Sequence, residues 1–242
     1  MSRSKTTRIL KTSGIILCAV TFITLSIIIY FFRVEPLAID EAVRDFAYSI
    51  RGQKYGFMYW FFRLITEFGN YLMIIVILFV AAFYTKVDYR FILLAFGIML
   101  STIINVGLKD LYSRERPILE MRWMSEDTTS FPSGHSTAAG FMYSFIIYLI
   151  YHEDYNKKVK VTVYSICGAL IPLVMFSRII LGVHYFTDVI AGAATGIMVS
   201  CLCMLLYRYC VNNNILSQGL LKWNRKSKKE KTEDEEWYKM VD

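Results

Sequence analysis

The sequence predicts an all-α protein that crosses a membrane about six times. Two observations support this prediction. Hydrophobic residues make up 55% of the 242 residues and aromatic residues 16%, which is more than soluble domains usually carry. The apolar residues also gather in six stretches, and a membrane-spanning helix needs roughly 20 mostly apolar residues. We therefore expect one polytopic helical domain.

The six stretches are separated by short polar connections. They cover approximately Gly14–Phe32, Leu64–Tyr84, Phe91–Gly107, Ser136–Tyr151, Val161–Phe176 and Val189–Tyr207. The fourth and fifth are short and contain Ser, Thr and Gly, which membranes accept where helices pack together. We interpret the first as an anchor, because no small-residue cleavage site follows it. The predicted organisation is a tail at 1–12, a six-span domain at 13–210 and a charged tail at 211–242.

Charge predicts the orientation of the chain. The formal net charge is +7, and most Lys and Arg residues fall in both tails and in the second and fourth connections. Under the positive-inside rule these segments are cytoplasmic. We expect a multi-pass cell-membrane protein with both termini in the cytoplasm. No basic stripe with interleaved aromatic residues is present, so nucleic acid is not an expected partner.

The first outward connection contains a periodic apolar pattern. Ile39, Val43, Phe46 and Ile50 are spaced by three or four residues, which predicts one apolar face on a helix. Such a helix could lie on the membrane surface between the first two spans, or pack as an ordinary loop helix. Both interpretations are open at this stage.

Three polar segments are predicted to meet at the outer face. They are KDLYSRERP at 109–117, PSGH at 132–135 and SRIILGVHYFTD at 177–188. The first two share one connection, and the third follows two spans later. Two spans return the chain to the same side of the membrane, so all three can converge.

The first two segments suit an anion. Lys109 and Arg116 are seven residues apart and would share one face of a continuing helix, which Pro117 would end. They could hold a bound anion or contact phospholipid headgroups. In the second segment, Ser133 could cap the following helix, and Gly134 lets backbone N–H groups approach a phosphate. His135 would lie beside that anion, although a simple helix cap is the alternative.

The third segment suits nucleophilic chemistry. His184 and Asp188 are four residues apart and face the same way on a helical turn. A carboxylate on one imidazole nitrogen fixes the tautomer and leaves the other nitrogen free to attack. Arg178 adds a guanidinium group that fits phosphate oxygens. A structural ion pair at a helix start is the alternative interpretation.

Together these segments provide the groups for phosphoryl transfer without a metal or another cofactor. Acidic residues do not cluster in the pattern of a metal site. The charge clamp, the two histidines and the carboxylate are sufficient for the reaction.

The combination resembles the type-two phosphatidic acid phosphatase superfamily, which also includes bacterial acid phosphatases and vanadium haloperoxidases. The family pattern is Lys, six residues, Arg-Pro; then Pro-Ser-Gly-His; then Ser-Arg, five residues, His, three residues, Asp. Every part is present here, and the resemblance covers about 64–207. The resemblance implies that His184 is the nucleophile, that Asp188 orients it and that His135 protonates the leaving oxygen. It also implies a set of phosphate-binding residues, namely Lys109, Arg116, Arg178, Ser133 and Gly134.

The expected function is therefore that of a membrane lipid phosphatase acting at the outer face through a phosphohistidine. Its partner would be a lipid phosphate, with phosphatidylglycerophosphate, phosphatidate and a polyprenyl diphosphate as candidates. Many relatives continue Arg-Pro with a second Arg-Pro, whereas Ile118 and Leu119 follow Pro117 here, so the choice of substrate is less transferable. A lipid phosphotransferase using the same site and a non-catalytic phospholipid transporter are the alternatives.

Overall fold

The computed structural model describes residues 3–32, 35–84, 89–152 and 155–212. All regular secondary structure in these ranges is helical, as the sequence predicts. The elements are α1 (Arg3–Phe31), α2 (Ala38–Arg51), α3 (Phe57–Glu67), α4 (Tyr71–Tyr84), α5 (Tyr89–Tyr112), the 3-10 helix η1 (Leu119–Met121), α6 (Gly134–His152), α7 (Lys157–Ile180) and α8 (Phe186–Asn212).

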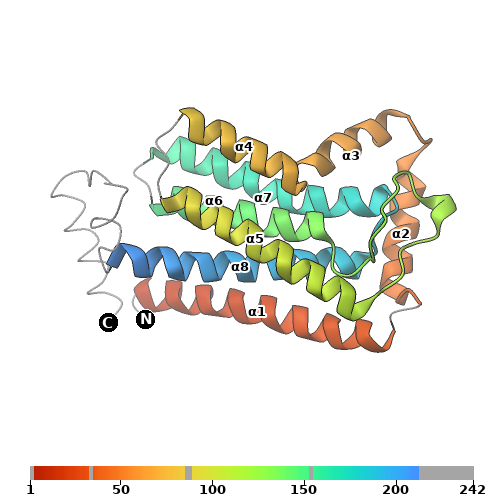
Figure 1. Ribbon diagram of the computed structural model, residues 1–242, viewed down its shortest axis with the longest axis horizontal. Helices are drawn as coiled ribbons and strands as arrows, with labels where there is room; N and C mark the ends of the chain where they lie inside the picture. Colours follow the sequence, from red (N-terminus) through yellow and green to blue (C-terminus); the bar gives the residue numbers. More distant parts are fainter. Residues whose placement is uncertain (1–2, 33–34, 85–88, 153–154, 213–242) are drawn as a thin grey trace.

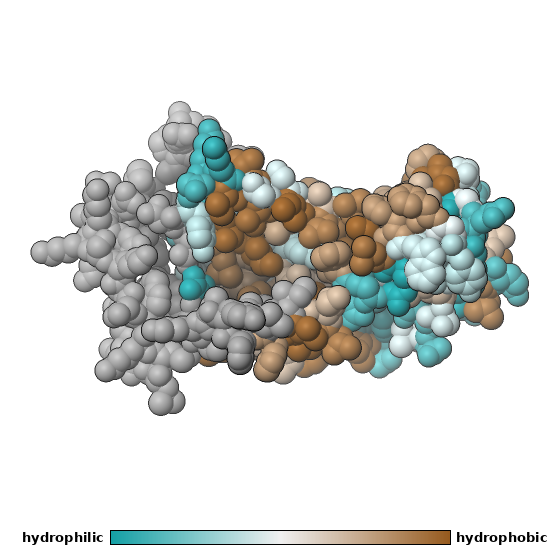
Figure 2. All heavy atoms as spheres, turned by 90° about the horizontal axis from the view of Figure 1, so that it is seen from above, coloured by the Kyte–Doolittle hydropathy of each residue, from teal (hydrophilic) through white to brown (hydrophobic). Residues whose placement is uncertain are grey.

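The long helices run along one common direction, and α2 lies across one end of the bundle (Figure 1). Helix α1 begins and α8 ends at the opposite end. Hydrophobic residues cover much of the middle of the molecule in the view of Figure 2, and hydrophilic residues gather toward the end that carries α2. This distribution is expected of a helical bundle in a bilayer, where lipid surrounds the middle and water the ends.

Three helices in the described ranges are long and apolar enough to cross a membrane: Arg90–Tyr112, Lys157–Ile180 and Phe186–Cys210. A shorter apolar helix covers Ile16–Phe31. These four helices coincide with the predicted first, third, fifth and sixth stretches, and α6 contains the fourth. The membrane character is thus confirmed, and the count of six spans stays a prediction.

Close packing of α6 against α8 forms the centre of the bundle. This pair makes the most extensive contact between any two elements, and small residues such as Ala139 and Ala194 are buried along it. Small side chains let two helix backbones approach, which compensates for the weak hydrophobic drive inside a membrane. Larger side chains, including Phe141 and Phe145, fill the adjoining core.

The second predicted stretch is not one helix, which corrects the sequence prediction. It is divided between α3 and α4 by a break at 68–70. The Asn70 side-chain oxygen accepts a hydrogen bond from the Leu72 backbone N–H at 3.0 Å and so caps the start of α4. The Tyr143 hydroxyl donates to the carbonyl oxygen of Phe68 at 2.7 Å. Hydropathy alone missed the break because the residues on both sides of it are apolar.

Helix α2 has the predicted position between the first two stretches. Asp40 and Ala47 face the protein and are buried. Of the four predicted apolar residues, Val43 packs against the buried core, whereas Ile39, Phe46 and Ile50 are exposed. The helix therefore packs on the bundle through one face and leaves most of its predicted apolar residues uncovered, and its contact with the membrane surface remains a prediction.

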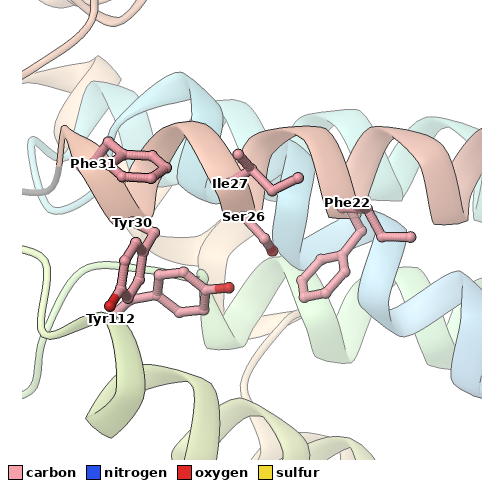
Figure 3. A pocket seen from close by; sticks show the side chains of 7 residues that line it. Phe22, Ser26, Ile27, Tyr30, Phe31 and Tyr112 are labelled. Atoms are coloured by element: carbon pink, nitrogen blue, oxygen red, sulfur yellow. The ribbon is translucent and has the colours of Figure 1, made fainter.

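A groove lies between α1 and the end of α5, close to the end where α2 lies (Figure 3). The ring of Tyr112 in its wall contacts the ring of Phe131 at a centroid distance of 4.9 Å. Phe131 is fully buried and directly precedes the PSGH segment. The C-terminal end of α1 thus helps to support the chain that enters α6, because Ile29 shares a buried cluster with Tyr112 and Phe131. The groove is lined by Phe22, Ile23, Ser26, Ile27, Tyr30, Phe31 and Tyr112.

The contact between α6 and α8 predicts a stability difference between two glycines. A Cβ atom at Gly196 would lie 2.1 Å from the Thr137 backbone oxygen, whereas one at Gly168 on α7 would meet nothing within 4 Å. Gly196→Ala should lower the free energy of unfolding by about 1–3 kcal/mol because the two backbones must separate. Thermal unfolding in detergent measures the effect. Gly168→Ala is the matched control, and equal stability of the two variants would contradict this packing.

Candidate active site

The structure brings the three predicted segments together at the end of the bundle where α2 lies. The first supplies the end of α5 and the loop 113–133, the second starts α6, and the third forms the turn between α7 and α8. Backbone contacts join them directly. The Ser133 N–H donates to the Asp188 carbonyl oxygen at 3.1 Å, and the Trp123 N–H donates to that of Leu181 at 2.9 Å.

The helix predicted to carry both Lys109 and Arg116 is shorter than expected. Helix α5 ends at Tyr112, and the next residue, Ser113, has a φ of +44° that turns the chain away. Arg116 therefore lies in the loop and not on the helix face. The two cations still reach the same region, because loop carbonyl oxygens hold both. Lys109 donates to that of Thr129, and Arg116 to that of Thr128 at 2.6 Å.

Ser133 caps α6 as predicted. Its hydroxyl oxygen accepts from the Ser136 N–H at 3.4 Å and lies 3.0 Å from the Ser136 hydroxyl. The Asn105 side chain, one turn before Lys109 on α5, donates to the Pro132 carbonyl oxygen at 3.3 Å. Gly134 is the first residue of the helix, so its backbone N–H is among those left without a partner inside the helix.

The turn after α7 places His184. Gly182 has a φ of +75°, and a Cβ atom there would lie 2.8 Å from the Met121 carbonyl oxygen. A residue with a side chain would be strained in this conformation and would push the loop away. Val183 and Tyr185 complete the turn, and α8 starts at Phe186. His184 is consequently held before the first turn of α8, with its side chain 2% exposed.

The contacts of the His184 ring fix its tautomer. The Nε2 atom lies 3.2 Å from a terminal nitrogen of Arg116. A guanidinium group only donates hydrogen bonds, so Nε2 must carry a lone pair. The proton of the neutral ring is then on Nδ1, which faces Asp188 Oδ2 at 3.5 Å. This separation is within ion-pair reach but longer than an ordinary hydrogen bond.

Burial and neighbouring charge keep the ring neutral. Burial lowers the pKa of His184 well below its ordinary value, and the positive charges of Arg116, Arg178 and Lys109 lower it further. Burial also lowers the pKa of Arg116 to about 10, which leaves this guanidinium charged at neutral pH. The site therefore combines a neutral imidazole with fixed cations.

Asp188 is held from several sides. Its Oδ2 accepts from the Ser130 hydroxyl and from the Tyr185 N–H, the latter at 2.8 Å. Its Oδ1 accepts from Arg114 at 2.6 Å. The carboxylate is fully buried, so these bonds compensate for the loss of water. Its orientation relative to His184 is therefore well defined.

Arg178 is fully buried at the end of α7. One terminal nitrogen donates to the Thr66 hydroxyl of α3 at 2.8 Å, and the other contacts the Glu126 carboxylate. Glu126 also lies 3.9 Å from Arg116. An anionic group thus already lies between the two guanidinium groups.

His135 lies in the first turn of α6 and is partly exposed. Arg178, His184 and Arg116 are close enough to act on it electrostatically. Both predicted histidines therefore belong to one cluster with the predicted cations. His152, in contrast, is the last residue of α6 at the other end of that helix.

The sequence did not identify several residues that organise this cluster. Asn105 was detectable, because an amide in an apolar stretch signals a functional position. Arg114 lies within the first polar segment, between Lys109 and Arg116, but the family pattern gives it no role. The sequence around the remaining residues gives no sign of a role in the site. These residues are Asp40, Thr66, Glu126, Ser130 and Thr187.

A family model described as the PAP2 superfamily matches residues 90–212, which include all eight predicted site residues. The chain belongs to the PAP2 superfamily. This confirms the resemblance inferred from the three motifs.

Two relatives in the PAP2 superfamily are named as lipid phosphatases. Phosphatidylglycerophosphatase B of Bacillus subtilis is 40% identical over 118 residues, which are 48% of this chain and 57% of that protein. The match thus spans little more than half of that relative's length. The lipid A 4'-phosphatase of Porphyromonas gingivalis is 25% identical over 183 residues, which are 70% of this chain and 74% of that protein.

Two solved structures have similar folds. A transmembrane PAP2-type phosphatidylglycerolphosphate phosphatase from Bacillus subtilis matches with a TM-score of 0.69 and 30% identity, over 81% of this chain and 96% of the other. LpxE from Aquifex aeolicus matches with a TM-score of 0.58 and 22% identity, over 71% and 98% of the two chains. The second likeness concerns the fold alone.

The environment of His184 in this PAP2 chain predicts its protonation behaviour. Because its pKa is lowered, the ring should stay neutral when the pH falls through about 6.5, where an unperturbed histidine gains its proton. Nitrogen-15 NMR of histidine-labelled protein should show the Nδ1–H tautomer at pH 6. The spectrum of His184→Ala assigns the signal. A signal that titrates above pH 6.5 would contradict the described environment.

Proposed function

We propose that this protein is a membrane lipid phosphatase that removes a terminal phosphate from a lipid at the outer face of the cell membrane. The observation that carries the proposal is the pair of contacts on His184, with Arg116 at Nε2 and Asp188 facing Nδ1. A neutral imidazole whose Nε2 lone pair lies among cations suits attack on phosphorus once Arg116 turns from Nε2 to the phosphoryl oxygens. The names of the relatives support a lipid phosphate as substrate.

In the proposed reaction, the His184 Nε2 lone pair forms a bond to phosphorus while the bond from phosphorus to the lipid oxygen breaks. His135, which takes up a proton as the anionic lipid phosphate binds beside it, donates that proton to the leaving oxygen, so the lipid leaves as an alcohol. Water, giving a proton back to His135, then attacks the phosphohistidine. The phosphorus–nitrogen bond breaks and inorganic phosphate is released.

The phosphoryl oxygens would be bound by charge and by backbone donors. Lys109, Arg116 and Arg178 supply positive charge. Ser133 and Gly134 lie at the start of α6, where backbone N–H groups can donate to a phosphate. Negative charge develops on these oxygens during transfer, so fixed cations lower the barrier without a metal. Phosphatidylglycerophosphate, phosphatidate and polyprenyl diphosphates all present such a group.

The placement in the membrane follows from charge. The starts of α5 and α7, which carry Arg90, Lys157, Lys158 and Lys160, lie at one end of the bundle, and the start of α8, which follows His184, lies at the other (Figure 1). Under the positive-inside rule the first end is cytoplasmic, so the site faces outward. A lipid could then keep its tails in the bilayer while its phosphate enters the cluster.

Phosphate release from a panel of lipid phosphates in detergent tests this function. The native protein should release inorganic phosphate from at least one lipid, also in the presence of a chelator. His184→Ala should lower kcat at least about 1,000-fold, and Asp188→Asn roughly 100-fold or more because the tautomer is no longer fixed. His152→Ala, at the other end of the bundle, should leave kcat unchanged.

Three results, two from this experiment and one from a transport assay, would overturn the proposal. Release from no member of the panel would exclude a lipid phosphatase. Transfer of the phosphoryl group to a lipid hydroxyl, with no inorganic phosphate, would identify a phosphotransferase. Transport of phospholipid that persists in His184→Ala would favour a carrier.

The position of Glu126 predicts competition with phosphate. Its carboxylate contacts Arg178 and lies near Arg116, where the substrate charge is expected, so it must move or gain a proton when phosphate binds. Glu126→Gln should lower the Kd for inorganic phosphate about tenfold, which corresponds to about 1.4 kcal/mol. Calorimetry measures the change, with the exposed Glu120→Gln as control. Weaker phosphate binding in Glu126→Gln would show that the carboxylate assists binding instead.

A further inference from the structure

A second buried carboxylate is joined to the proposed catalytic pair. Asp40, in the first turn of α2, is fully buried. Its Oδ2 accepts from Arg114 at 2.7 Å, and the same guanidinium donates to Asp188 Oδ1 at 2.6 Å. A continuous chain of contacts therefore runs from α2 through the loop after α5 to the first turn of α8, and from there to His184.

Arg114 has little freedom in this arrangement. Its side chain is 1% exposed, and its guanidinium carbon lies 4.5 Å from the centre of the Tyr185 ring. The two carboxylates take different terminal nitrogens. A planar guanidinium that is bonded on both sides cannot rotate without breaking one of the bonds. Its position therefore depends on Asp40 as well as on Asp188.

Asp40 is fixed in turn by Thr187, the residue before Asp188. The Thr187 N–H donates to Asp40 Oδ1 at 2.8 Å, and its hydroxyl lies 2.9 Å from both carboxylate oxygens. That hydroxyl also accepts from Arg114 at 2.8 Å. Asp40 consequently contacts the backbone of α8 directly and Asp188 through Arg114.

The two carboxylate oxygens of Asp188 bind different partners. Arg114 takes Oδ1, while Oδ2 is left for Ser130, the Tyr185 N–H and the side facing His184. If Arg114 shifted, Oδ1 would lose its partner, and only the bonds to Oδ2 would keep the carboxylate directed at Nδ1. The bond that Asp40 accepts from Arg114 opposes this shift.

We propose that Asp40 is a positioning residue of the active site, which fixes the carboxylate of Asp188 through Arg114 and thereby the direction and tautomer of the His184 ring. This inference rests on the proposed function of His184 and Asp188. Helix α2, which lies across one end of the bundle, would then also help to position the catalytic groups.

A double-mutant cycle on kcat tests the inference. The set is Asp40→Asn, Asp188→Asn and the double variant, with Asp45→Asn as the matched control, because Asp45 is an exposed acid on the same helix. Asp40→Asn should lower kcat about 10-fold, within the coupling expected in one ion-pair network, and leave KM within about twofold. Asp45→Asn should match the native enzyme. In the Asp188→Asn background, Asp40→Asn should have no further effect, because it acts through Asp188.

A second measurement separates positioning from support of the fold. Nitrogen-15 NMR of Asp40→Asn should show the His184 ring as a mixture of tautomers, while the thermal unfolding transition remains cooperative. If Asp40→Asn does not fold, Asp40→Asn with Arg114→Met removes the whole link to Asp188, whose carboxylate keeps its bonds from Ser130 and the Tyr185 N–H. This variant should also lower kcat about 10-fold.

The outcomes distinguish this inference from the proposed function. Native kcat in folded Asp40→Asn, or in the variant that also carries Arg114→Met, overturns the role of Asp40. Equal fractional losses from Asp40→Asn in the native and Asp188→Asn backgrounds overturn it too. If His184→Ala and Asp188→Asn themselves retain native kcat, the proposed function fails instead.

Discussion

The burial of Arg114 is the constraint on which the active-site end depends. A guanidinium without water is stable only where anions compensate for its charge. Burial opposes the charged form of Arg114, but the attraction of Asp188 and Asp40 outweighs burial and raises its pKa. One cation therefore needs two carboxylates from different helices. To meet that need, the chain must bring α2, the loop after α5 and the start of α8 into one place.

The helix bundle makes this meeting possible. Tight contact between α6 and α8 sets their first turns beside one another, and the Ser133 N–H reaches the Asp188 carbonyl oxygen. The positive ends of two helix dipoles then lie side by side, which favours anions. The cations around His184 strengthen this preference. Packing in the apolar part of the molecule thus produces the electrostatics of its polar end.

The sequence predicts the helices and the clustered motifs because both signals are local. Apolar stretches mark the helices, and fixed spacings such as His184 to Asp188 mark the site. The break at 68–70 was missed because hydropathy does not report how a backbone is capped. The end of α5 was missed because contacts with the distant residues 128 and 129 hold the loop. Asp40 and Arg114 are separated by 74 residues, and no short pattern specifies such a partner.

The long sequence separation of these charges has a consequence for biogenesis. Apolar helices can enter a bilayer one after another, because each satisfies its own backbone hydrogen bonds. The network of Asp40 and Arg114, in contrast, is complete only when Asp188 is present. Asp188 is near the start of the last described helix. A nascent chain that lacks α8 can pair Arg114 with Asp40 but has no Asp188. The cluster around His184 is therefore complete only after the last described helix has joined the bundle.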